Sequence, residues 1–343
     1  MSGAVVVARA PGKLFLTGEW VVLRGAPAVV AAVDRLAKVS VAVADGPGPL
    51  VVDSQAEGRE QNGDSADGPL PGGDAGAVLA ALRAARARAP RLAGRGVAAR
   101  VDSGAFLHGT AKLGLGRSAA TLTAATVALL AAAGAHDPVA AFATAVAAHA
   151  LFQGGRGSGA DVAAAFHGGV IEVTRGEAGL RVAPRALPAG LHLVVGWTGA
   201  GAATPPLLAR FDATGEPAVL GELAAVAREA AAAVARGDAA ALCRAVDASC
   251  ALLDALGREA GIPIVTPALA RLVAAARRAG AVAKPSGAGG GDCGIALAES
   301  AAQAAAVRAA WEAEGLVPLA LAIASEGVRY EVGGAVASEV PLG

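Results

Sequence analysis

Residues 112–120 read KLGLGRSAA and lead into an Ala- and Leu-rich stretch, 117–133, whose composition predicts a long helix. Glycines just before a helix let the backbone approach an anion closely, and the free N–H groups and dipole of the helix N-terminus then favour phosphate. Ser118 stands at the predicted helix start, where its hydroxyl could cap the helix or ligate Mg²⁺. A glycine turn with a capping serine would explain the same residues without a ligand. The order GxxxxGK[ST] is absent, which excludes a P-loop here.

A second glycine-rich segment, GGRGSGAD, covers residues 154–161. Its flexible glycines bring one carboxylate, Asp161, to the start of a predicted helix at about 160–166. The acid could serve a reaction, or it could simply stabilise the helix N-terminus.

A third segment, KPSGAGGGDCG, covers residues 284–294. Residues 289–294 match GxGxxG, but the residues that follow, IALA, read as a strand, whereas a dinucleotide fingerprint must open a helix. The glycines are better explained by a loop that packs against phosphates or against the first glycine segment.

A single lysine, Lys13, lies in PGKLFLTGEW at residues 11–20. Taken alone it is weak evidence of function, because an exposed lysine at the end of a strand would look the same. Five histidines are scattered along the chain and are interpreted as surface or satisfied core residues: His108, His136, His149, His167 and His192.

Length and composition indicate a folded protein of two domains. The chain has 343 residues, of which 55% are hydrophobic and only 3% aromatic, so Ala, Val and Leu carry the apolar fraction. Lys plus Arg equals Asp plus Glu at 29 each, so the formal net charge is zero. A neutral chain offers no general attraction for nucleic acid or an anionic membrane, and any cationic site must be local.

The cysteines and the N-terminus indicate the compartment. Cys243, Cys250 and Cys293 show neither CxxC pairing nor zinc spacing, which suits a reducing environment. Arg9 and Lys13 interrupt the N-terminal apolar run too early for a secretory signal, and charged residues break the Ala-rich stretches. We expect a cytoplasmic protein without a membrane span, as a monomer or homodimer.

Apolar runs between Gly and Pro predict strands, and longer Ala- and Leu-rich stretches predict helices. The predicted strands are 4–9, 13–23, 27–33, 37–44, 96–103, 169–174, 191–197, 294–298, 316–323 and 328–332. The predicted helices are 76–89, 117–133, 138–152, 160–166, 217–236, 239–257, 267–280 and 301–314. The polar stretch 45–76 predicts an exposed loop or hairpin excursion. A domain boundary near residue 187 divides the chain into 1–187 and 188–343.

Together, in this order and at these separations, the four segments resemble those of the GHMP kinase superfamily. That family has an N-terminal lysine motif, a GLGSSA-type phosphate loop, a GSGxD segment and a C-terminal GAGGG loop. The similarity covers nearly the whole chain apart from 45–76. Within the superfamily the segments, KPSGAGGGDCGIAL above all, are most similar to ATP-dependent phosphomevalonate kinases, and the Asp292-Cys-Gly ending is the most discriminating piece.

The resemblance implies an α+β fold and an activity. The expected fold joins an N-terminal domain like ribosomal protein S5 domain 2 (1–187) to a ferredoxin-like C-terminal domain (188–343), with the site between them. The expected activity is ATP- and Mg²⁺-dependent phosphorylation of (R)-5-phosphomevalonate to 5-diphosphomevalonate in the mevalonate route to isoprenoids. The alternatives are another GHMP small-molecule kinase, such as mevalonate kinase, or a non-catalytic ligand-binding homologue.

The resemblance also assigns residue roles. Lys13 and Asp161 would be catalytic, and Ser118 would ligate Mg²⁺. The expected ATP-binding residues are Lys112, Gly114, Leu115, Gly116, Arg117, Ser118 and Ala119. The expected substrate-binding residues are Lys13, Glu19, Arg156, Ser158, Gly159, Ser286, Gly287, Ala288, Gly289 and Asp292.

Two positions depart from the family pattern. Arg117 stands where the family usually has the first serine of a pair, and it could contact phosphate or obstruct ATP. Residues 197–204 read WTGAGAAT, without the lysine that the family commonly carries there.

The expected acceptor determines which residues should matter most. A phosphate monoester has its second pKa near 6, so the attacking oxygen is already mostly ionised and proton abstraction supplies little. Positively charged groups should therefore contribute most to catalysis, namely Mg²⁺ and the side chains of Lys13, Lys112, Arg156 and Arg117. Asp161 should then orient Lys13 and the metal site more than it acts as a base, whereas an alcohol acceptor would need a base.

Overall fold

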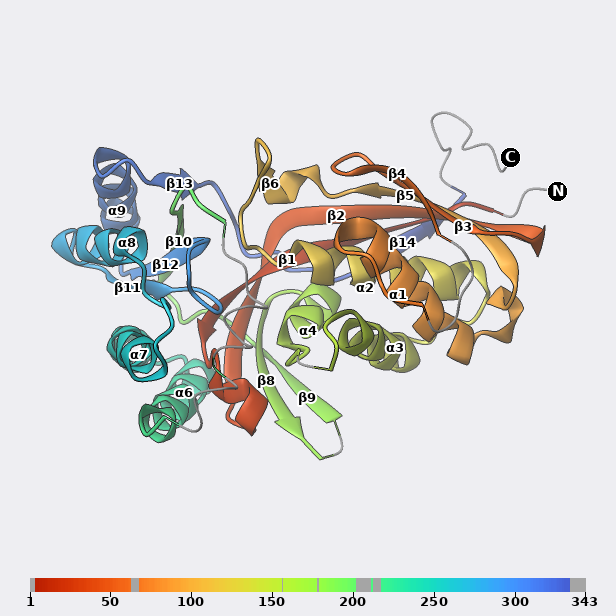
Figure 1. The fold of residues 1–343 in the computed structure, drawn as a ribbon. Helices are drawn as coiled ribbons and strands as arrows, with labels where there is room; N and C mark the ends of the chain where they lie inside the picture. Colours follow the sequence, from red (N-terminus) through yellow and green to blue (C-terminus); the bar gives the residue numbers. More distant parts are fainter. Residues whose placement is uncertain are drawn as a thin grey trace.

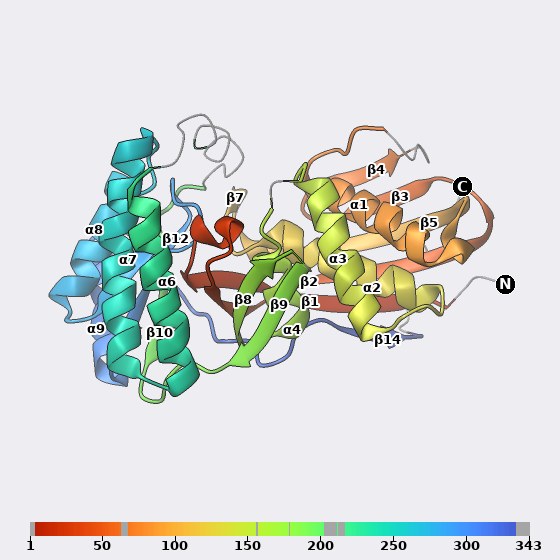
Figure 2. The same cartoon turned by 90° about the horizontal axis from the view of Figure 1, so that it is seen from below.

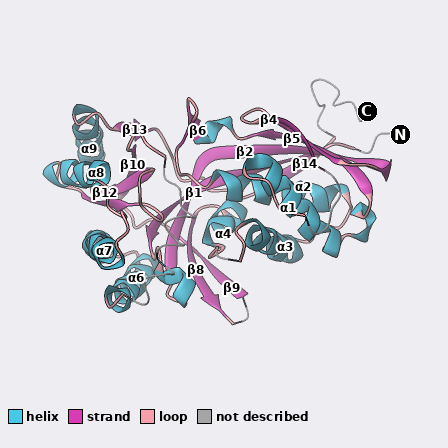
Figure 3. Ribbon diagram, viewed as in Figure 1, coloured by secondary structure: helices cyan, strands magenta, loops and turns pink. Residues whose placement is uncertain are grey.

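The computed structural model describes residues 4–62, 68–155, 157–177, 179–201, 211 and 217–333. Within these residues, an eight-stranded and a four-stranded sheet form two neighbouring groups, each with its own helices (Figure 1). Figure 3 separates the two element types by colour. Among the described helices, none has both the length and the apolar character that crossing a bilayer would require.

The larger sheet has the order β14-β1-β2-β5-β3-β4, and β8 pairs with β2 and β9. Its strands are β1 Val6–Thr17, β2 Ala28–Pro47, β3 Leu50–Ser54, β4 Gly58–Asn62, β5 Arg95–Asp102, β8 Val170–Gly176, β9 Gly179–Arg185 and β14 Arg329–Val332. The pairing is antiparallel except between β3 and β5. A small hairpin, β6 Leu107–His108 with β7 Ala111–Lys112, lies apart from this sheet.

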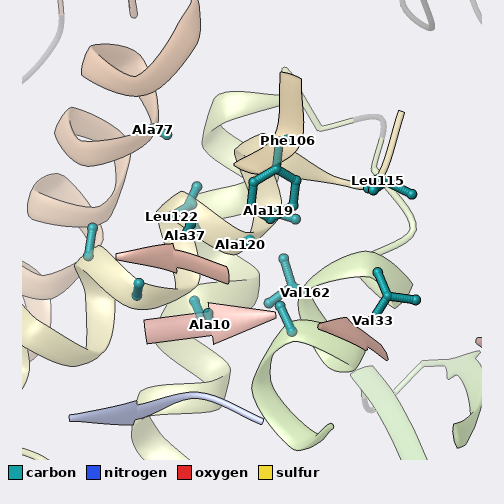
Figure 4. Close-up of a cluster of buried hydrophobic side chains, with 14 of the residues drawn as sticks. Ala10, Val33, Ala37, Ala77, Phe106, Leu115, Ala119, Ala120, Leu122 and Val162 are labelled. Carbon is teal, nitrogen blue, oxygen red and sulfur yellow. The ribbon is translucent and has the colours of Figure 1, made fainter. Parts of the chain in front are cut away.

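Helices cover one face of the larger sheet (Figure 2). They are α1 Gly73–Arg88, α2 Arg117–Ala132, α3 Pro138–Phe152 and α4 Ala160–His167. Every residue of α2 from Ala119 to Leu130 is buried, because small alanine side chains let the helix lie close to β1 and β2. Figure 4 shows Phe106 and Leu115 packed near Ala119 at the start of α2. This packing fixes the N-terminus of α2 relative to the strands.

The smaller sheet has the order β11-β12-β10-β13 and is antiparallel where its strands pair. Its strands are β10 His192–Trp197, β11 Val282–Pro285, β12 Cys293–Ala298 and β13 Val317–Leu319. Its helices are α6 Val219–Arg236, α7 Ala239–Ala260, α8 Pro267–Arg278 and α9 Ala301–Ala313. Asp238, Thr266 and Ser300 each cap a helix start by accepting a backbone N–H, which explains where α7, α8 and α9 begin.

The structure confirms the predicted helices to within a few residues and corrects several strands. The strands expected at 4–9 and 13–23 are one continuous strand, β1, followed by a short 3₁₀ helix at Val21–Arg24. Those expected at 27–33 and 37–44 form the single strand β2. The excursion at 45–76 contains the β3–β4 hairpin, and the first residues of α1 end it. Two more short 3₁₀ helices occur at Pro90–Leu92 and Gly104–Phe106.

The chain returns to its first sheet near its end, because β14 pairs with β1 over Val6–Arg9. The sequence pattern did not predict this return, nor the strand β9. The domain boundary near residue 187 remains a prediction.

Candidate active site

A cavity of about 630 Å³ lies between the two groups of elements. It is lined by β1, the loop before α2, the end of α3, the start of α4 and the loop between β11 and β12. Of the predicted site residues, the cavity brings together Lys13, Glu19, Lys112, Gly114, Leu115, Gly116, Arg117, Ser118, Ala119, Ser158, Asp161, Ser286, Gly287, Ala288 and Asp292.

The loop before α2 lies directly against the strand that carries Lys13. The Lys13 N–H donates to the Leu115 carbonyl at 2.8 Å. A Cβ at Gly12 would lie 2.7 Å from that carbonyl, and one at Gly116 would lie 2.9 Å from Cγ of Lys13. Gly116 also has φ of +80°, a conformation that glycine adopts most readily. Glycine is therefore required at both positions so that β1 and the loop before α2 can lie this close together. A backbone that binds phosphate needs such close approach.

The N-terminus of α2 opens into the cavity without a side-chain cap. Gly116 is the N-cap residue and no side chain accepts from the helix, so Ser118 does not cap it. Ser118 lines the cavity instead. The first N–H groups and the helix dipole thus favour an anion such as an ATP phosphate. Ser118 and Asp161 also supply oxygen donors to the same cavity, the donor type that Mg²⁺ prefers, so these residues fit the metal.

Arg117 is held at the cavity wall by acids from the β3–β4 hairpin and α1. Its guanidinium forms an ion pair with Glu57, and its Nε lies 4.0 Å from Oδ1 of Asp74. The Arg117 side chain is only 9% exposed. Glu57 also accepts the N–H of Asp74 at 2.6 Å, so one carboxylate joins the hairpin to the starts of two helices.

Asp74 is a buried acceptor that the sequence analysis did not identify. Its carboxylate accepts from the hydroxyls of Ser54 at 2.8 Å, Ser103 at 2.7 Å and Thr121 at 3.2 Å. This carboxylate joins β3, α1, α2 and the residue that follows β5 behind Arg117. No short motif marks such a group, because its members lie on separate elements.

Asp161 lies at the start of α4 and faces His149 in the last turn of α3. Oδ2 of Asp161 is 3.3 Å from Nε2 of His149, and Oδ1 accepts the Val162 N–H at 3.0 Å. Burial opposes ionisation of Asp161 and by itself would raise its pKa. The charge of His149 and its interaction with the carboxyl act in the opposite direction and lower the pKa. Lys13 and the Val162 N–H lower it further, and together these effects outweigh burial. They hold the pKa of Asp161 well below its usual range.

His149 also lines this cavity, although the sequence analysis interpreted it as a surface or satisfied core histidine. Burial alone would lower its pKa, but the Asp161 carboxylate beside it more than compensates and raises the pKa above its ordinary value. One feature of the sequence could have indicated that His149 lies near the site, because it is in the last turn of a predicted helix that leads into the GGRGSGAD segment.

The loop between β11 and β12 is fastened to β1 by buried polar contacts. The Lys284 ammonium pairs with the Glu19 carboxylate and donates to the Pro285 carbonyl at 2.7 Å. The Ser286 hydroxyl accepts the Phe15 N–H at 2.9 Å and donates to the Phe15 carbonyl at 3.1 Å. Glu19 thus faces the cavity with its carboxylate already engaged, and these contacts join the two halves of the site.

The end of the same loop packs against the glycine loop before α2. Asp292 has φ of +55°, unusual for a residue other than glycine, and a Cβ at Gly114 would overlap its side chain. The Asp292 carbonyl accepts both the N–H and the hydroxyl of Thr198 at 3.0 Å. The Cys293 thiol donates to Leu113 at 2.9 Å, and burial raises the pKa of this thiol. The expectation that this loop packs against the first glycine segment is confirmed.

Two predicted substrate-binding glycines, Gly159 and Gly289, do not line the cavity. A Cβ at Gly159 would lie 2.6 Å from Cδ1 of Leu180, and one at Gly289 would collide with the Ile264 carbonyl. Close packing against these neighbours accounts for glycine at both positions. Arg156 lies outside the described residues, as do residues 202–204 of the WTGAGAAT segment.

Comparison with known proteins places the chain among small-molecule kinases. The family described as GHMP kinases C terminal matches residues 230–316. The chain is 36% identical over 369 residues to a phosphomevalonate kinase from Streptomyces sp. (strain CL190), with 94% of this chain and 98% of that protein covered. It is 34% identical over 342 residues to a mevalonate kinase from Aeropyrum pernix, with the same coverage.

A solved structure shares the fold. Streptococcus pneumoniae phosphomevalonate kinase in complex with phosphomevalonate and AMPPNP matches with a TM-score of 0.77 at 20% identity, covering 92% of this chain and 99% of that one. The likeness confirms the fold class predicted from the sequence, an α+β fold of the two-domain GHMP kinase type.

Proposed function

We propose that this chain, which belongs to the GHMP kinase family, transfers the γ-phosphoryl group of ATP to (R)-5-phosphomevalonate and forms 5-diphosphomevalonate. The observation that carries the proposal is the convergence of Lys13, Ser118 and Asp161 on one cavity at the uncapped N-terminus of α2. The choice of acceptor is supported by the relative from Streptomyces, which aligns over nearly the full chain.

In the proposed reaction the glycine loop and the α2 N-terminus hold the ATP phosphates. Lys13 reaches this loop from β1 and stabilises charge on the transferred group. Bound Mg²⁺ would neutralise phosphate charge, with Ser118 and Asp161 as its protein ligands. Lys112 and Arg117 add positive charge at the cavity wall, where two polyanions must meet. Arg156 remains a predicted contributor from outside the described residues.

A second candidate is mevalonate kinase activity, favoured by the relative from Aeropyrum pernix. The two candidates differ in the attacking oxygen, which is a phosphate oxygen in one and an alcohol in the other. A non-catalytic ligand-binding homologue is a third alternative, since Arg117 replaces a serine of the phosphate loop.

ADP release measured with phosphomevalonate, mevalonate and homoserine in turn separates these candidates. The proposal expects turnover with phosphomevalonate well above the other acceptors and above ATP alone. The Lys13→Met variant, prepared in parallel, controls for contaminating kinases. Preferred turnover of mevalonate would overturn the proposal in favour of the second candidate. Binding of an acceptor without any turnover would favour the third.

A further inference from the structure

A buried ion pair, Lys284 with Glu19, lies at the wall of the cavity. The Lys284 side chain is 0% exposed and that of Glu19 is 3% exposed. Lys284 also donates to the Pro285 carbonyl at 2.7 Å, so two acceptors fix its ammonium. Glu19 lines the cavity and Lys284 does not. Lys284 therefore does not contact a ligand in the cavity directly, and its route to the site is through Glu19.

Glu19 and Lys13 approach the same loop residue, Gly287. Oε1 of Glu19 accepts the Gly287 N–H at 3.3 Å. A Cβ on Gly287 would lie 3.8 Å from Nζ of Lys13. No described residue donates a hydrogen bond to Oε2 of Glu19, so this oxygen can accept from a further cation. The carboxylate and the Lys13 ammonium are therefore neighbours, while Lys284 holds the carboxylate.

The Lys13 ammonium is positioned by contacts that leave its charge unpaired. Its Nζ lies 5.3 Å from the centre of the Phe15 ring, and the Ser286 hydroxyl binds the backbone of Phe15. Glu19 pairs with Lys284 instead, and none of the ion pairs among the described residues includes Lys13. The charge of Lys13 is thus left for a ligand in the cavity.

We propose that Lys284 is a positioning residue of the nucleotide site. By pairing with Glu19 inside the protein, it keeps that carboxylate off the Lys13 ammonium, so that the charge of Lys13 stays available for the phosphates. This inference rests on the proposed function, because it takes the ATP phosphates to lie at Lys13, and it assigns a role to a residue that touches no ligand.

The physical reason is the strength of electrostatic attraction at short range. Opposite charges attract strongly where little water separates them, and a Glu19 carboxylate without Lys284 has Lys13 as its neighbouring cation. An ion pair between Glu19 and Lys13 would cancel the positive charge that a phosphate needs. With Lys284 in place the charge of the carboxylate is already balanced, and the site keeps a free cation where two polyanions must meet.

Calorimetric titration with the ATP analogue AMPPNP and Mg²⁺ tests this role, because it gives the Kd of the competent molecules separately from their fraction. In Lys284→Met we expect Kd to rise about tenfold or more. The double variant Lys284→Met with Glu19→Gln lacks the charge of the carboxylate as well, so its Kd should return to within about threefold of the wild type. Lys38→Met, the same change at an exposed position of β2, is the matched control and should bind as the wild type does.

A purely structural role of Lys284 would lower the fraction of competent molecules and leave their Kd unchanged, which would contradict the inference. A double variant that binds as weakly as Lys284→Met would also contradict it, because the loss would then not come from the charge of Glu19. If Lys284→Met does not fold, Lys284→Gln takes its place with the same expectation, since glutamine keeps a hydrogen-bond donor without the charge.

The two proposals fail in different ways. If the wild type does not bind AMPPNP, both fail. If it binds AMPPNP but does not phosphorylate phosphomevalonate, the proposed function fails, and the calorimetry still decides the role of Lys284. If the wild type does both and Lys284→Met binds AMPPNP equally well, only the inference about Lys284 fails.

Discussion

The N–H of Lys13 donates a 2.8 Å hydrogen bond to the carbonyl of Leu115, so the strand bearing the proposed catalytic lysine is joined directly to the phosphate loop. The backbone of the lysine and the cradle for the anion are thereby set at a fixed distance before any ligand binds. Such preorganisation is what makes a charged group effective in phosphoryl transfer, because the site need not reorganise during the reaction.

Replacing Lys13 by methionine should remove the charge and keep most of the packing. We expect kcat/KM to fall by a factor equivalent to roughly 3 kcal/mol or more, the scale of losing one preorganised donor. Lys38→Met, at an exposed position of β2, is the control and should behave as the wild type. Steady-state kinetics with phosphomevalonate measure both variants, and near-normal turnover in Lys13→Met would remove this residue from the mechanism.

Glu57 and Asp74, the acids beside Arg117, should affect the affinity for ATP. Arg117→Ser leaves Glu57 and Asp74 without their cation, so the cavity wall becomes more negative and KM for ATP should rise about tenfold. Glu57→Gln keeps an acceptor for the Asp74 N–H but removes a negative charge, so KM for ATP should fall a few-fold. Glu60→Gln on the exposed part of β4 is the control. A gain in activity for Arg117→Ser would instead identify the arginine as an obstruction.

The buried pair of Lys284 and Glu19 should matter for stability. Lys284→Met leaves the Glu19 carboxylate buried without its cation, and we expect a loss of about 3 kcal/mol in the free energy of unfolding. Arg258→Ala removes the exposed pair with Asp254 and should cost less than about 1 kcal/mol. Urea denaturation of the three proteins makes the comparison. Equal losses in the two variants would show that Lys284 is not paired as described.

The pair of His149 and Asp161 should make stability depend on pH. The pKa of Asp161 is lowered on folding, so its contribution is present above the unfolded value of 3.8 and lost as pH falls. The pKa of His149 is raised, so its contribution is present below 6.5 and lost as pH rises through the folded value. The drop in Tm caused by Asp161→Asn should therefore be largest near pH 5 and smaller on the alkaline side. A drop that grows with rising pH would have the wrong sign for this pair.

The sequence predicted those parts of the site that depend on local backbone chemistry. Glycines before a helix, a capping aspartate and Ala-rich helical stretches act on backbone only a few residues away. The glycine loop before α2 and the helix boundaries could therefore be predicted without a structure. The sequence analysis expected two strands, 4–9 and 13–23, because Pro11 and Gly12 separate them, but both residues lie within the single strand β1. Pro11 lies beyond the residues of β1 that pair with β14, where a strand tolerates the missing N–H.

Features that depend on tertiary contacts could not be predicted from one sequence. His149 lies beside Asp161 only because α3 and α4 pack together. Arg117 pairs with Glu57, sixty residues away in the chain, and β14, which follows the smaller sheet in the chain, pairs with β1 of the larger sheet. In each case the partner is specified by packing of whole elements, which leaves no short pattern in the sequence.

The most direct test of the central claim is the structure of the product. ³¹P NMR of a reaction containing ATP, Mg²⁺ and phosphomevalonate should show a new pair of mutually coupled resonances from a phosphoanhydride, at the rate of ADP formation. This result requires that a phosphate oxygen made the attack. Phosphomevalonate left unchanged in this reaction, with a new phosphate monoester formed in a parallel reaction that contains mevalonate instead, would contradict the account.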